Sequence, residues 1–258
     1  NVELAKALIE AGANIDAPDH QECTPIYRAV SNSSINVLKI LLKSGASTMP
    51  YPSIVSPLHI AVRRGFLPVA KLLISAKADV RARDENGIEP IHYIGAGALF
   101  NIHEGLCAMA AVDALTPDAF ENDAEPEPEF KNLDLQCLKL LLNNGADVNA
   151  TDSFGNNVLQ LNATTRSSQL IKYLIKSGAQ VNHTNHNGQT ALHILLRGLF
   201  CTATISSLKT LLKCGANPNL KDKEGKTPFD ALDKNHHFPD PWKKKIIKII
   251  NSFEHPKD

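Results

Sequence analysis

Apolar residues recur along this chain in short helical clusters, which are separated by polar segments of similar length. Leu138 and Leu141 lie one turn apart on a helix, and Gly145 follows where a left-handed residue can end that helix. Residues 147–154 contain turn-forming side chains without helical periodicity, and Gly155 permits a positive backbone angle before the next apolar cluster. The local pattern predicts a helix, a projecting hairpin and a second helix.

Two phrases repeat through the chain. The first phrase, typified by Gly-Ala-Asp-Val-Asn, closes a helix and begins at Gly12, Gly45, Lys77, Gly145, Gly178 and Gly215. The second phrase opens a helix at Thr24-Pro25, Ser56-Pro57, Glu89-Pro90, Asn157-Val158, Thr190-Ala191 and Thr227-Pro228. Thr, Ser or Asn offers a side-chain oxygen to the free amides of the first turn, and Pro occupies a position where its missing N–H costs nothing. Each unit is therefore predicted to contain two capped helices.

Successive opening phrases are separated by 32, 33, 68, 33 and 37 residues, against a period of about 33 for one class of repeat. In both phrases and in this spacing the chain resembles the ankyrin repeat family. The resemblance covers nearly all of the chain outside one insertion and the extreme C-terminus. It implies an all-α repeat solenoid of stacked helix-turn-helix ankyrin repeats with β-hairpin loops.

The repeat register predicts the domain boundaries. Residues 1–18 form a partial N-terminal ankyrin repeat with its second helix only, so we expect the chain to be a fragment of a longer protein. Ankyrin repeats occupy 19–94 and 133–221, an acidic insertion occupies 95–132, and 222–258 form a C-terminal capping repeat. In that last segment an amphipathic helix is expected to turn its isoleucines inward; a basic membrane-surface helix is the weaker alternative.

The insertion carries the largest charge asymmetry of the sequence. From Asp84 to Phe130 there are eleven acidic residues and no Lys or Arg, although the whole chain has 27 of each sign. Its part near 124–129 alternates acids with prolines and is predicted to be a mobile loop. The segment could recruit a basic partner, fold back on basic repeats, or serve only as a solubilising spacer.

Composition excludes several classes of function. A net charge of zero gives no global field toward nucleic acid or an anionic membrane, and no apolar run approaches the ~20 residues needed to span a bilayer. The five cysteines are scattered without CxxC spacing, which argues against a disulfide framework and a zinc site. We expect a monomer in the cytoplasm or nucleus, with no nucleic acid and no membrane as partner.

The sequence contains no recognisable catalytic or cofactor motif. No phosphate-binding glycine loop, nucleophile elbow or HExxH motif is present, so we expect no enzyme activity, no cofactor and no metal. His59, His92 and His193 share one place in the opening phrase, where the family resemblance implies a structural bridge between neighbouring repeats. The cluster of His183, His186 and His193 lacks ligand spacing.

Contact residues are predicted from the repeat register. In ankyrin-like stacks the hairpin tips and the ends of first helices line a concave face that binds another protein. The candidates are His20, Gln21, Ser53, Val55, Arg63, Arg64, Glu85, Asn86, Tyr93, Ser153, Phe154, His186, Asn187, Arg197 and Lys223. The apolar edge near 51–55 is either covered by a partner or packed on the neighbouring hairpin. Arg63 and Arg64 could equally be solvated cations that stabilise a helix end by about 0.3–1 kcal/mol.

The resemblance leaves two further functions open. The chain could be the targeting domain of a larger enzyme or toxin whose catalytic part lies elsewhere, or a substrate of an asparaginyl hydroxylase. Asn149, Asn182 and Asn219 match the position that is modified in ankyrin repeats, each with a leucine eight residues earlier. The alternative is that these asparagines only bond backbone groups of the hairpin. Our main prediction is a non-enzymatic protein-protein interaction module of an adaptor, scaffold or host-directed effector.

Overall fold

The helix caps predicted from the opening phrase are present in the structure, a computed structural model that describes residues 2–49, 55–95, 130–163, 167–198, 202–233 and 240–254. The Ser56 hydroxyl accepts a hydrogen bond from the His59 amide, and the Asn157 side chain accepts one from the Gln160 amide. These bonds satisfy amides that no helical carbonyl can reach. Ser53 and the acidic residues 96–129 lie outside the described residues.

The chain divides into two compact units. Unit 1 contains residues 1–97 and 132–147, and unit 2 contains residues 98–131 and 148–258. The helices of unit 1 are α1 (Val2–Glu10), α2 (Pro25–Ser31), α3 (Ile35–Lys43), α4 (Pro57–Arg63), α5 (Leu67–Ser75), the 3-10 turn η1 (Pro90–Tyr93) and most of α8 (Phe130–Asn143). Those of unit 2 are α9 (Val158–Asn162), α10 (Ser168–Lys176), α11 (Ala191–Arg197), α12 (Thr202–Lys213), α13 (Pro228–Asp233) and α14 (Asp240–Glu254).

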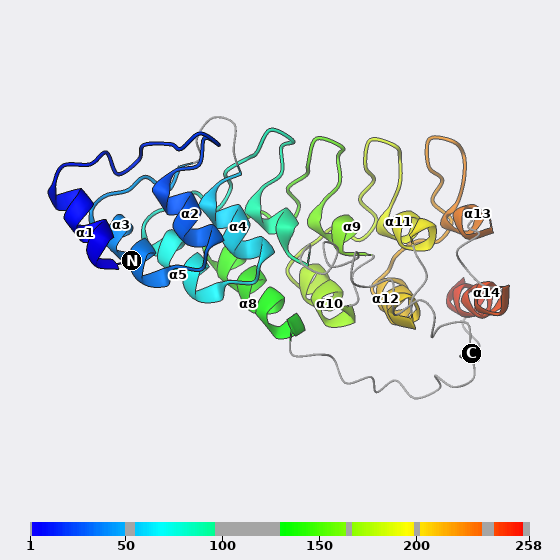
Figure 1. Ribbon diagram of the computed structural model, residues 1–258. Coiled ribbons are helices and arrows are strands. Elements are labelled where there is room, and N and C mark those ends of the chain that lie inside the picture. The colour runs from blue at the N-terminus through cyan, green and yellow to red at the C-terminus, as the bar shows by residue number, and fades with distance from the viewer. Residues whose placement is uncertain are drawn as a thin grey trace. The chain divides into compact units, whose positions relative to one another are not determined.

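Within each unit the helices form two layers (Figure 1). In unit 1, α2 packs on α4, and each packs on the second helix of its own repeat, α3 or α5. In unit 2, α11 lies between α9 and α13, while α12 lies between α10 and α14. Loops project from the first-helix layer of each unit. The described residues contain no named strand, so the structure confirms the predicted all-α repeat fold of stacked helix pairs.

Leucine and isoleucine fill the space between the layers. Leu38, Leu58 and Leu73 are fully buried in unit 1, as are Ile171 and Leu192 in unit 2. Because each repeat is two helices thick, its core is completed by the next repeat and not by residues of its own. The dependence of each repeat on its neighbour also explains the exposed leucines of α1. In α1, Leu4 and Leu8 stay 56% and 51% exposed, since no described residue covers that side of the helix.

The apolar residues of α14 face inward. Ile246 and Ile250 of α14 are buried, together with Trp242, while Lys244 and Lys248 face solvent. The apolar stripe of α14 therefore covers the preceding repeat.

A partly buried acid on α8 predicts an unusual pH dependence of unit 1. Burial raises the pKa of Asp134 to about 6, from 3.8, although the Gly95 amide hydrogen bond opposes this change. Because the folded chain holds this proton more tightly than the unfolded chain, this group's contribution to the free energy of unfolding falls as pH rises from about 4 to about 6.

We therefore expect Asp134→Asn to raise the free energy of unfolding at pH 7.5 by about 1 to 2 kcal/mol, allowing for partial solvent screening. The gain should vanish near pH 4, where the acid is protonated in the folded chain. Urea unfolding at both pH values, with Glu85→Gln at an exposed hairpin tip of the same unit as a control, measures the difference. An equal gain at pH 4 and pH 7.5 would contradict the assignment.

Candidate protein-interaction site

The hairpins are shaped by one acid or amide side chain at the start of each turn. The Oδ1 atom of Asp152 accepts hydrogen bonds from the amides of Phe154 and Asn156, at 2.9 and 2.8 Å. Asn185 and Asp222 bind the amides two and four residues further on in the same way. Asp19 and Asp84 do so in unit 1. The turn is therefore held by its first residue, and the two tip residues that follow are left to face solvent.

This geometry places most of the predicted contact residues at the tips. The tip pairs are His20 and Gln21, Glu85 and Asn86, Ser153 and Phe154, His186 and Asn187, and Lys223 and Glu224. All ten are exposed. Three tips belong to unit 2, and backbone hydrogen bonds join them: the His186 amide donates to the Phe154 carbonyl, and the Lys223 amide donates to the Asn187 carbonyl, both at 3.0 Å. We call Ser153, Phe154, His186, Asn187, Lys223 and Glu224 the unit-2 tip row.

Close packing between hairpins keeps the tip row rigid. The His186 ring lies over Gly155, where an added Cβ would come within 2.6 Å of the ring. The Nε2 atom of His183 bonds the Gly155 carbonyl at 2.9 Å. The side-chain amide of Asn185 donates to the side-chain oxygen of Asn156, also at 2.9 Å. Phe154 is 65% exposed on this framework. A large apolar side chain is thus presented to solvent on an ordered backbone, as in a binding hot spot.

The other predicted contact residues are placed more diversely. Arg197 is exposed at the end of α11, and Val55 and Arg63 are half-buried in unit 1. Arg64 donates a hydrogen bond to the Ser31 carbonyl of the preceding repeat, and its guanidinium also lies 5.7 Å from the Phe66 ring centroid. Arg64 therefore supports the packing of unit 1 as well as being exposed.

Two further candidates in unit 1, Tyr93 and Gln21, take part in contacts with neighbouring hairpin and helix residues. The Tyr93 hydroxyl donates to Asp84 at 3.3 Å, and its ring packs edge-on against His59 at 5.5 Å between centroids. Burial raises the pKa of Tyr93, so its hydroxyl stays protonated. Gln21 accepts a hydrogen bond from Arg28. The Arg28 guanidinium also binds Asp19 and holds the pKa of that carboxyl near 2. These contacts fix both candidates in place.

Two of the three repeated histidines, His59 and His193, act as bridges between neighbouring repeats, as predicted, while His92 accepts the Glu89 amide of its own cap at 2.9 Å. The Nδ1 atom of His59 accepts the Ser56 amide at 3.2 Å, and its Nε2 atom bonds the Ile88 carbonyl at 2.9 Å. His193 makes the same two contacts, with the Thr190 amide at 3.1 Å and the Lys226 carbonyl at 3.0 Å. In each pair the carbonyl belongs to the residue just before the cap of the next repeat.

The bridge needs a neutral imidazole, because only a neutral ring can accept at Nδ1 while it donates from Nε2. Burial lowers the pKa of His59 from 6.5. The stability that this bridge contributes is therefore present above pH 6.5 and is lost as the pH falls through the folded-state pKa.

Three repeats have a different side chain in place of the bridging histidine, namely Tyr27, Gln160 and Asp230. Gln160 accepts from the Asn157 amide at 2.9 Å and donates to the Gln189 carbonyl at 2.6 Å, so it makes both bonds of the histidine. Asp230 accepts from the amide and hydroxyl of Thr227, both at 2.8 Å. A carboxylate has no proton to donate onward. Asp230 therefore cannot make the second bond of the bridge, the one that histidine and glutamine donate to the next repeat.

The predicted modification sites also bridge repeats. Asn149 donates to the Gly178 carbonyl at 3.0 Å and accepts from the Gln180 amide at 2.9 Å. Asn182 makes the corresponding bonds to Gly215 and Asn217, at 3.0 and 2.8 Å. Asn219 makes no such side-chain bond within the described part of the chain. Two of the three side chains are thus occupied in holding the next repeat.

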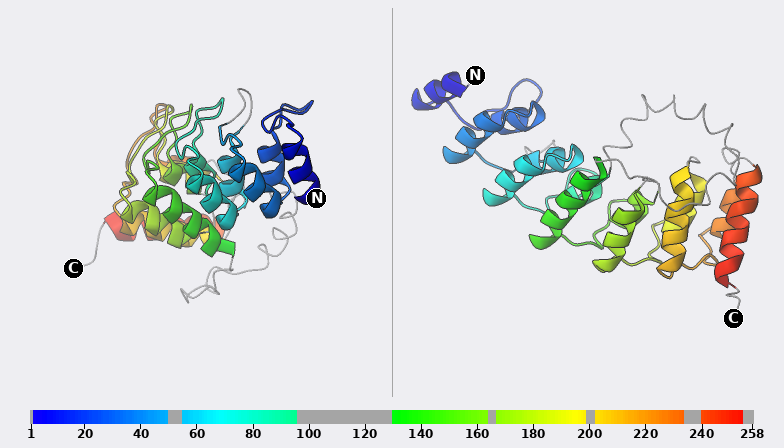
Figure 2. Two further views of the ribbon diagram at one scale, coloured as in Figure 1. Left: turned by 90° about the vertical axis from the view of Figure 1, so that its left-hand side faces the viewer. Right: turned by 90° about the horizontal axis from the view of Figure 1, so that it is seen from below.

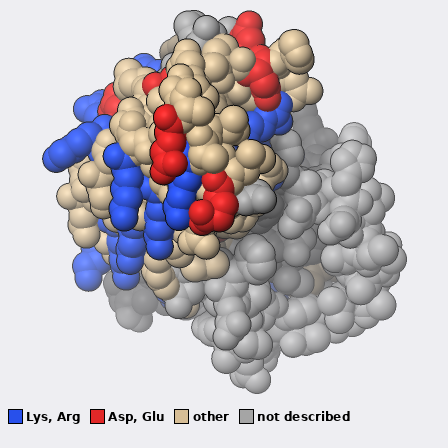
Figure 3. All heavy atoms as spheres, turned by 60° about the vertical axis from the view of Figure 1, so that its left-hand side comes forward, with Lys and Arg blue, Asp and Glu red and all other residues tan. Residues whose placement is uncertain are grey.

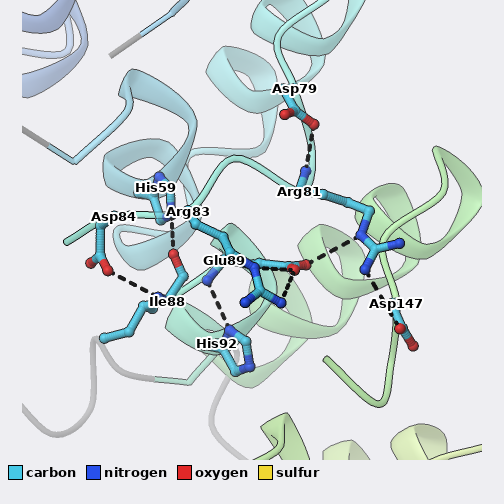
Figure 4. A network of polar contacts seen from close by, with 9 residues as sticks. All are labelled: His59, Asp79, Arg81, Arg83, Asp84, Ile88, Glu89, His92 and Asp147. Carbon is cyan, nitrogen blue, oxygen red and sulfur yellow. Dashed lines mark hydrogen bonds and ion pairs between the residues drawn. The ribbon is translucent and has the colours of Figure 1, made fainter. Parts of the chain in front are cut away.

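A charged network in unit 1 was not expected from the sequence (Figure 4). Glu89 stands where the other repeats have Ser, Thr or Asn, and its side chain is only 1% exposed. Arg83 lies 3.2 Å from its carboxylate and Arg81 lies 3.6 Å away, while Arg81 also pairs with Asp147 at 3.7 Å. Two acids and two arginines balance one another, so the network has a structural role and offers no spare charge to a ligand. The signal in the sequence was an acid at a capping position that follows two arginines.

The described residues hold no group of three His, Cys, Asp or Glu side chains that could bind a metal ion. Among them, no helix is both long and apolar enough to cross a bilayer.

Comparison with known proteins agrees with this geometry. Models of ankyrin repeats match residues 1–42, 55–85 and 129–222. Alpha-latrotoxin-Lg1a of Latrodectus geometricus is 32% identical over 87 residues, which are 33% of this chain and 6% of the toxin. The B-cell lymphoma 3 protein homolog of Mus musculus is 30% identical over 128 residues, which are 49% of this chain and 26% of that protein.

A solved structure has the same fold along almost the whole chain. The crystal structure of the ankyrin repeat domain of Bcl-3, described as a unique member of the IkappaB protein family, superposes with a TM-score of 0.67. It covers 97% of this chain and 91% of the Bcl-3 domain at 20% identity. The two repeating phrases, the bridging side chains and the fold agree with the matches to the family models. The chain therefore belongs to the ankyrin repeat family.

Proposed function

We propose that this chain is a non-enzymatic module that binds another protein through its hairpin tips, with the unit-2 tip row as the main contact surface. Ankyrin repeats are protein-protein interaction modules, which supports the general function. The observation that carries the specific site is Phe154, an aromatic side chain that is 65% exposed. Its hairpin is tied to the next one by a backbone hydrogen bond.

The chemistry of the tip row indicates the kind of contact. Phe154 supplies apolar area, His186 and Asn187 supply donors and acceptors, and Lys223 supplies a positive charge. Because the turns are already ordered by their own hydrogen bonds, little conformational entropy is lost when a partner binds. The partner surface should contain an apolar pocket for Phe154 surrounded by polar groups.

The surrounding protein sets the biological role. An adaptor, a scaffold, a host-directed effector, or the targeting domain of a larger enzyme or toxin would all use such a module. We place it as a monomer in the cytoplasm or nucleus. Cys23 and Cys137 are buried free thiols and Cys214 is a half-buried one, which suits a reducing compartment.

The test is affinity capture from cell lysate with quantitative mass spectrometry. We expect Phe154→Ala combined with His186→Ala to reduce capture of the partner more than tenfold, because loss of a hot spot costs about 2 kcal/mol or more. Phe253→Ala on α14, which removes another exposed phenylalanine, is the matched control. Circular dichroism should show unchanged helix content in both. Equal capture by both variants would exclude the tip row as the binding surface.

A further inference from the structure

The second helices of unit 2 carry a repeated arrangement of lysines that the tip row does not use. Lysines four residues apart occur on α10, α12 and α14, and such a pair lies on one face of its helix. The pairs are Lys172 and Lys176, Lys209 and Lys213, and Lys244 and Lys248. We call these six residues the unit-2 lysine face.

The three helices stand side by side, and the pairs on α10 and α12 occupy the same register, six and two residues before Gly178 and Gly215. α12 packs against both α10 and α14, and the three axes run next to one another when unit 2 is seen from below (Figure 2). Lys172, Lys176, Lys213, Lys244 and Lys248 are exposed. The buried residues of α14, Ile246 and Ile250, lie on the opposite side of the helix from Lys244 and Lys248.

Few acidic side chains lie on these three helices. Neither α10 nor α12 contains Asp or Glu, and α14 contains Asp240 in its first turn and Glu254 at its end. Within the described part of unit 2, no ion pair involves any of the five exposed lysines, whereas Lys226 on a hairpin pairs with Glu224. In another view, where the left-hand side of Figure 1 with the helices of unit 1 comes forward, Lys and Arg also gather into neighbouring columns (Figure 3).

Such an arrangement costs stability. Two like charges four residues apart destabilise a helix by about 0.2–0.5 kcal/mol, and this face contains three such pairs on adjacent helices. Acids and bases are unevenly distributed along the chain. Eleven acidic residues and no basic residue lie between Asp84 and Phe130, so the rest of the sequence has eleven more basic than acidic residues. A face that concentrates positive charge in this way is complementary to a concentrated negative charge.

The side chains distinguish among three classes of anionic partner. All six cations are lysine and none is arginine, and α10 and α12 present no large exposed aromatic residue. Nucleic-acid surfaces typically use arginine for bases and aromatic rings for stacking. No large exposed apolar residue on α10 or α12 provides the second signal that stable membrane attachment requires. Lysine acts as a mobile point charge, which suits flexible carboxylates.

We propose that the unit-2 lysine face is a second docking surface, separate from the tip row, and that it binds an acidic segment of a partner protein. Neighbouring helix axes lie about 8–10 Å apart, so the face is about 20 Å wide. An extended peptide advances about 3.3 Å per residue and crosses it in about six to eight residues. The segment therefore needs at least one carboxylate every second residue to meet all three pairs.

The test uses a fluorescent peptide of about ten alternating Asp and Glu residues, titrated with the intact chain at low and physiological salt. We expect Lys172→Gln, Lys176→Gln and Lys213→Gln together to weaken binding about tenfold or more. The control replaces Lys221, Lys223 and Lys226 with Gln on the hairpins, which removes the same charge, and should change the affinity less than twofold. Phe154→Ala should leave peptide binding unchanged, so a failed tip row and a failed lysine face are told apart.

Several results would overturn the proposal. Equal weakening by both triple variants would mean that only net charge is sensed. Absence of peptide binding at low salt would remove the docking surface. Binding to vesicles with anionic phospholipid, or to a DNA oligonucleotide, that is tighter than peptide binding and is lost in the α10 and α12 variant would assign the face to a membrane or to nucleic acid instead.

Discussion

Replacement of Gly188 by alanine should destabilise unit 2 by about 3 kcal/mol or more. Gly188 has a φ of +75°, and an added Cβ would lie 2.8 Å from the Lys223 backbone nitrogen and 3.1 Å from Asp222 Cα. The left-handed conformation alone costs an alanine about 1–2 kcal/mol. The close contact adds more, because a neighbouring backbone must move and the hydrogen bond between the Lys223 amide and the Asn187 carbonyl would be strained.

Gly225 provides the matched control for this experiment. It occupies the same position of the last described hairpin with the same φ of +75°, but nothing lies within 4 Å of its added Cβ. Gly225→Ala should cost only the conformational term, about 1–2 kcal/mol. Urea unfolding of both variants, monitored by circular dichroism, measures the difference. Equal destabilisation would show that neighbouring hairpins are not in the close contact described here.

Loss of the bridge at His193 should have an effect of similar size. His193→Leu removes the acceptor for the Thr190 amide and the donor to the Lys226 carbonyl in a site that is 0% exposed. A buried polar group that loses its partner costs about 1–3 kcal/mol, so the two losses together should cost about 3 kcal/mol. Tm and urea midpoint should both fall.

The chain itself supplies the rescue variant. Gln160 makes both bridge bonds in a neighbouring repeat, so His193→Gln should retain most of the stability and cost less than about 1 kcal/mol. If glutamine were as destabilising as leucine, the volume of the imidazole and not its hydrogen bonds would explain the role of His193.

Local chemistry made much of this molecule predictable. Asp152 and Gly155 define a turn within four residues, so the exposure of Ser153 and Phe154 between them follows from the hairpin phrase alone. Thr190 and His193 likewise lie within one helical turn, and their cap follows from the opening phrase. The start of α8 at Phe130, three residues before the expected Leu133, is within the uncertainty with which helix ends are read from a sequence.

Contacts between repeats were less predictable, because they depend on residues about 30 positions apart. Arg64 was expected as a partner-contact residue or a solvated cation, and neither expectation included the hydrogen bond of its guanidinium to the Ser31 carbonyl. Glu89 follows Arg81 and Arg83 in the sequence, but the ion pairs between them depend on the turn that brings the three side chains together. The lysine face was missed for the same reason. One lysine pair on one helix is ordinary, and only the packing of three helices makes a surface.

Asp230 has a consequence for how this array can grow. A histidine or glutamine at the bridge position donates to the carbonyl before the next repeat, so units that carry them can be duplicated or exchanged without loss of the junction. A carboxylate in that place would bring one of its own oxygens against the same carbonyl oxygen. Both atoms are negatively charged acceptors, so they would repel each other. A copied repeat should therefore be accepted upstream of Asp230, whereas a repeat inserted directly after Asp230 would need a hydrogen-bond donor in its place.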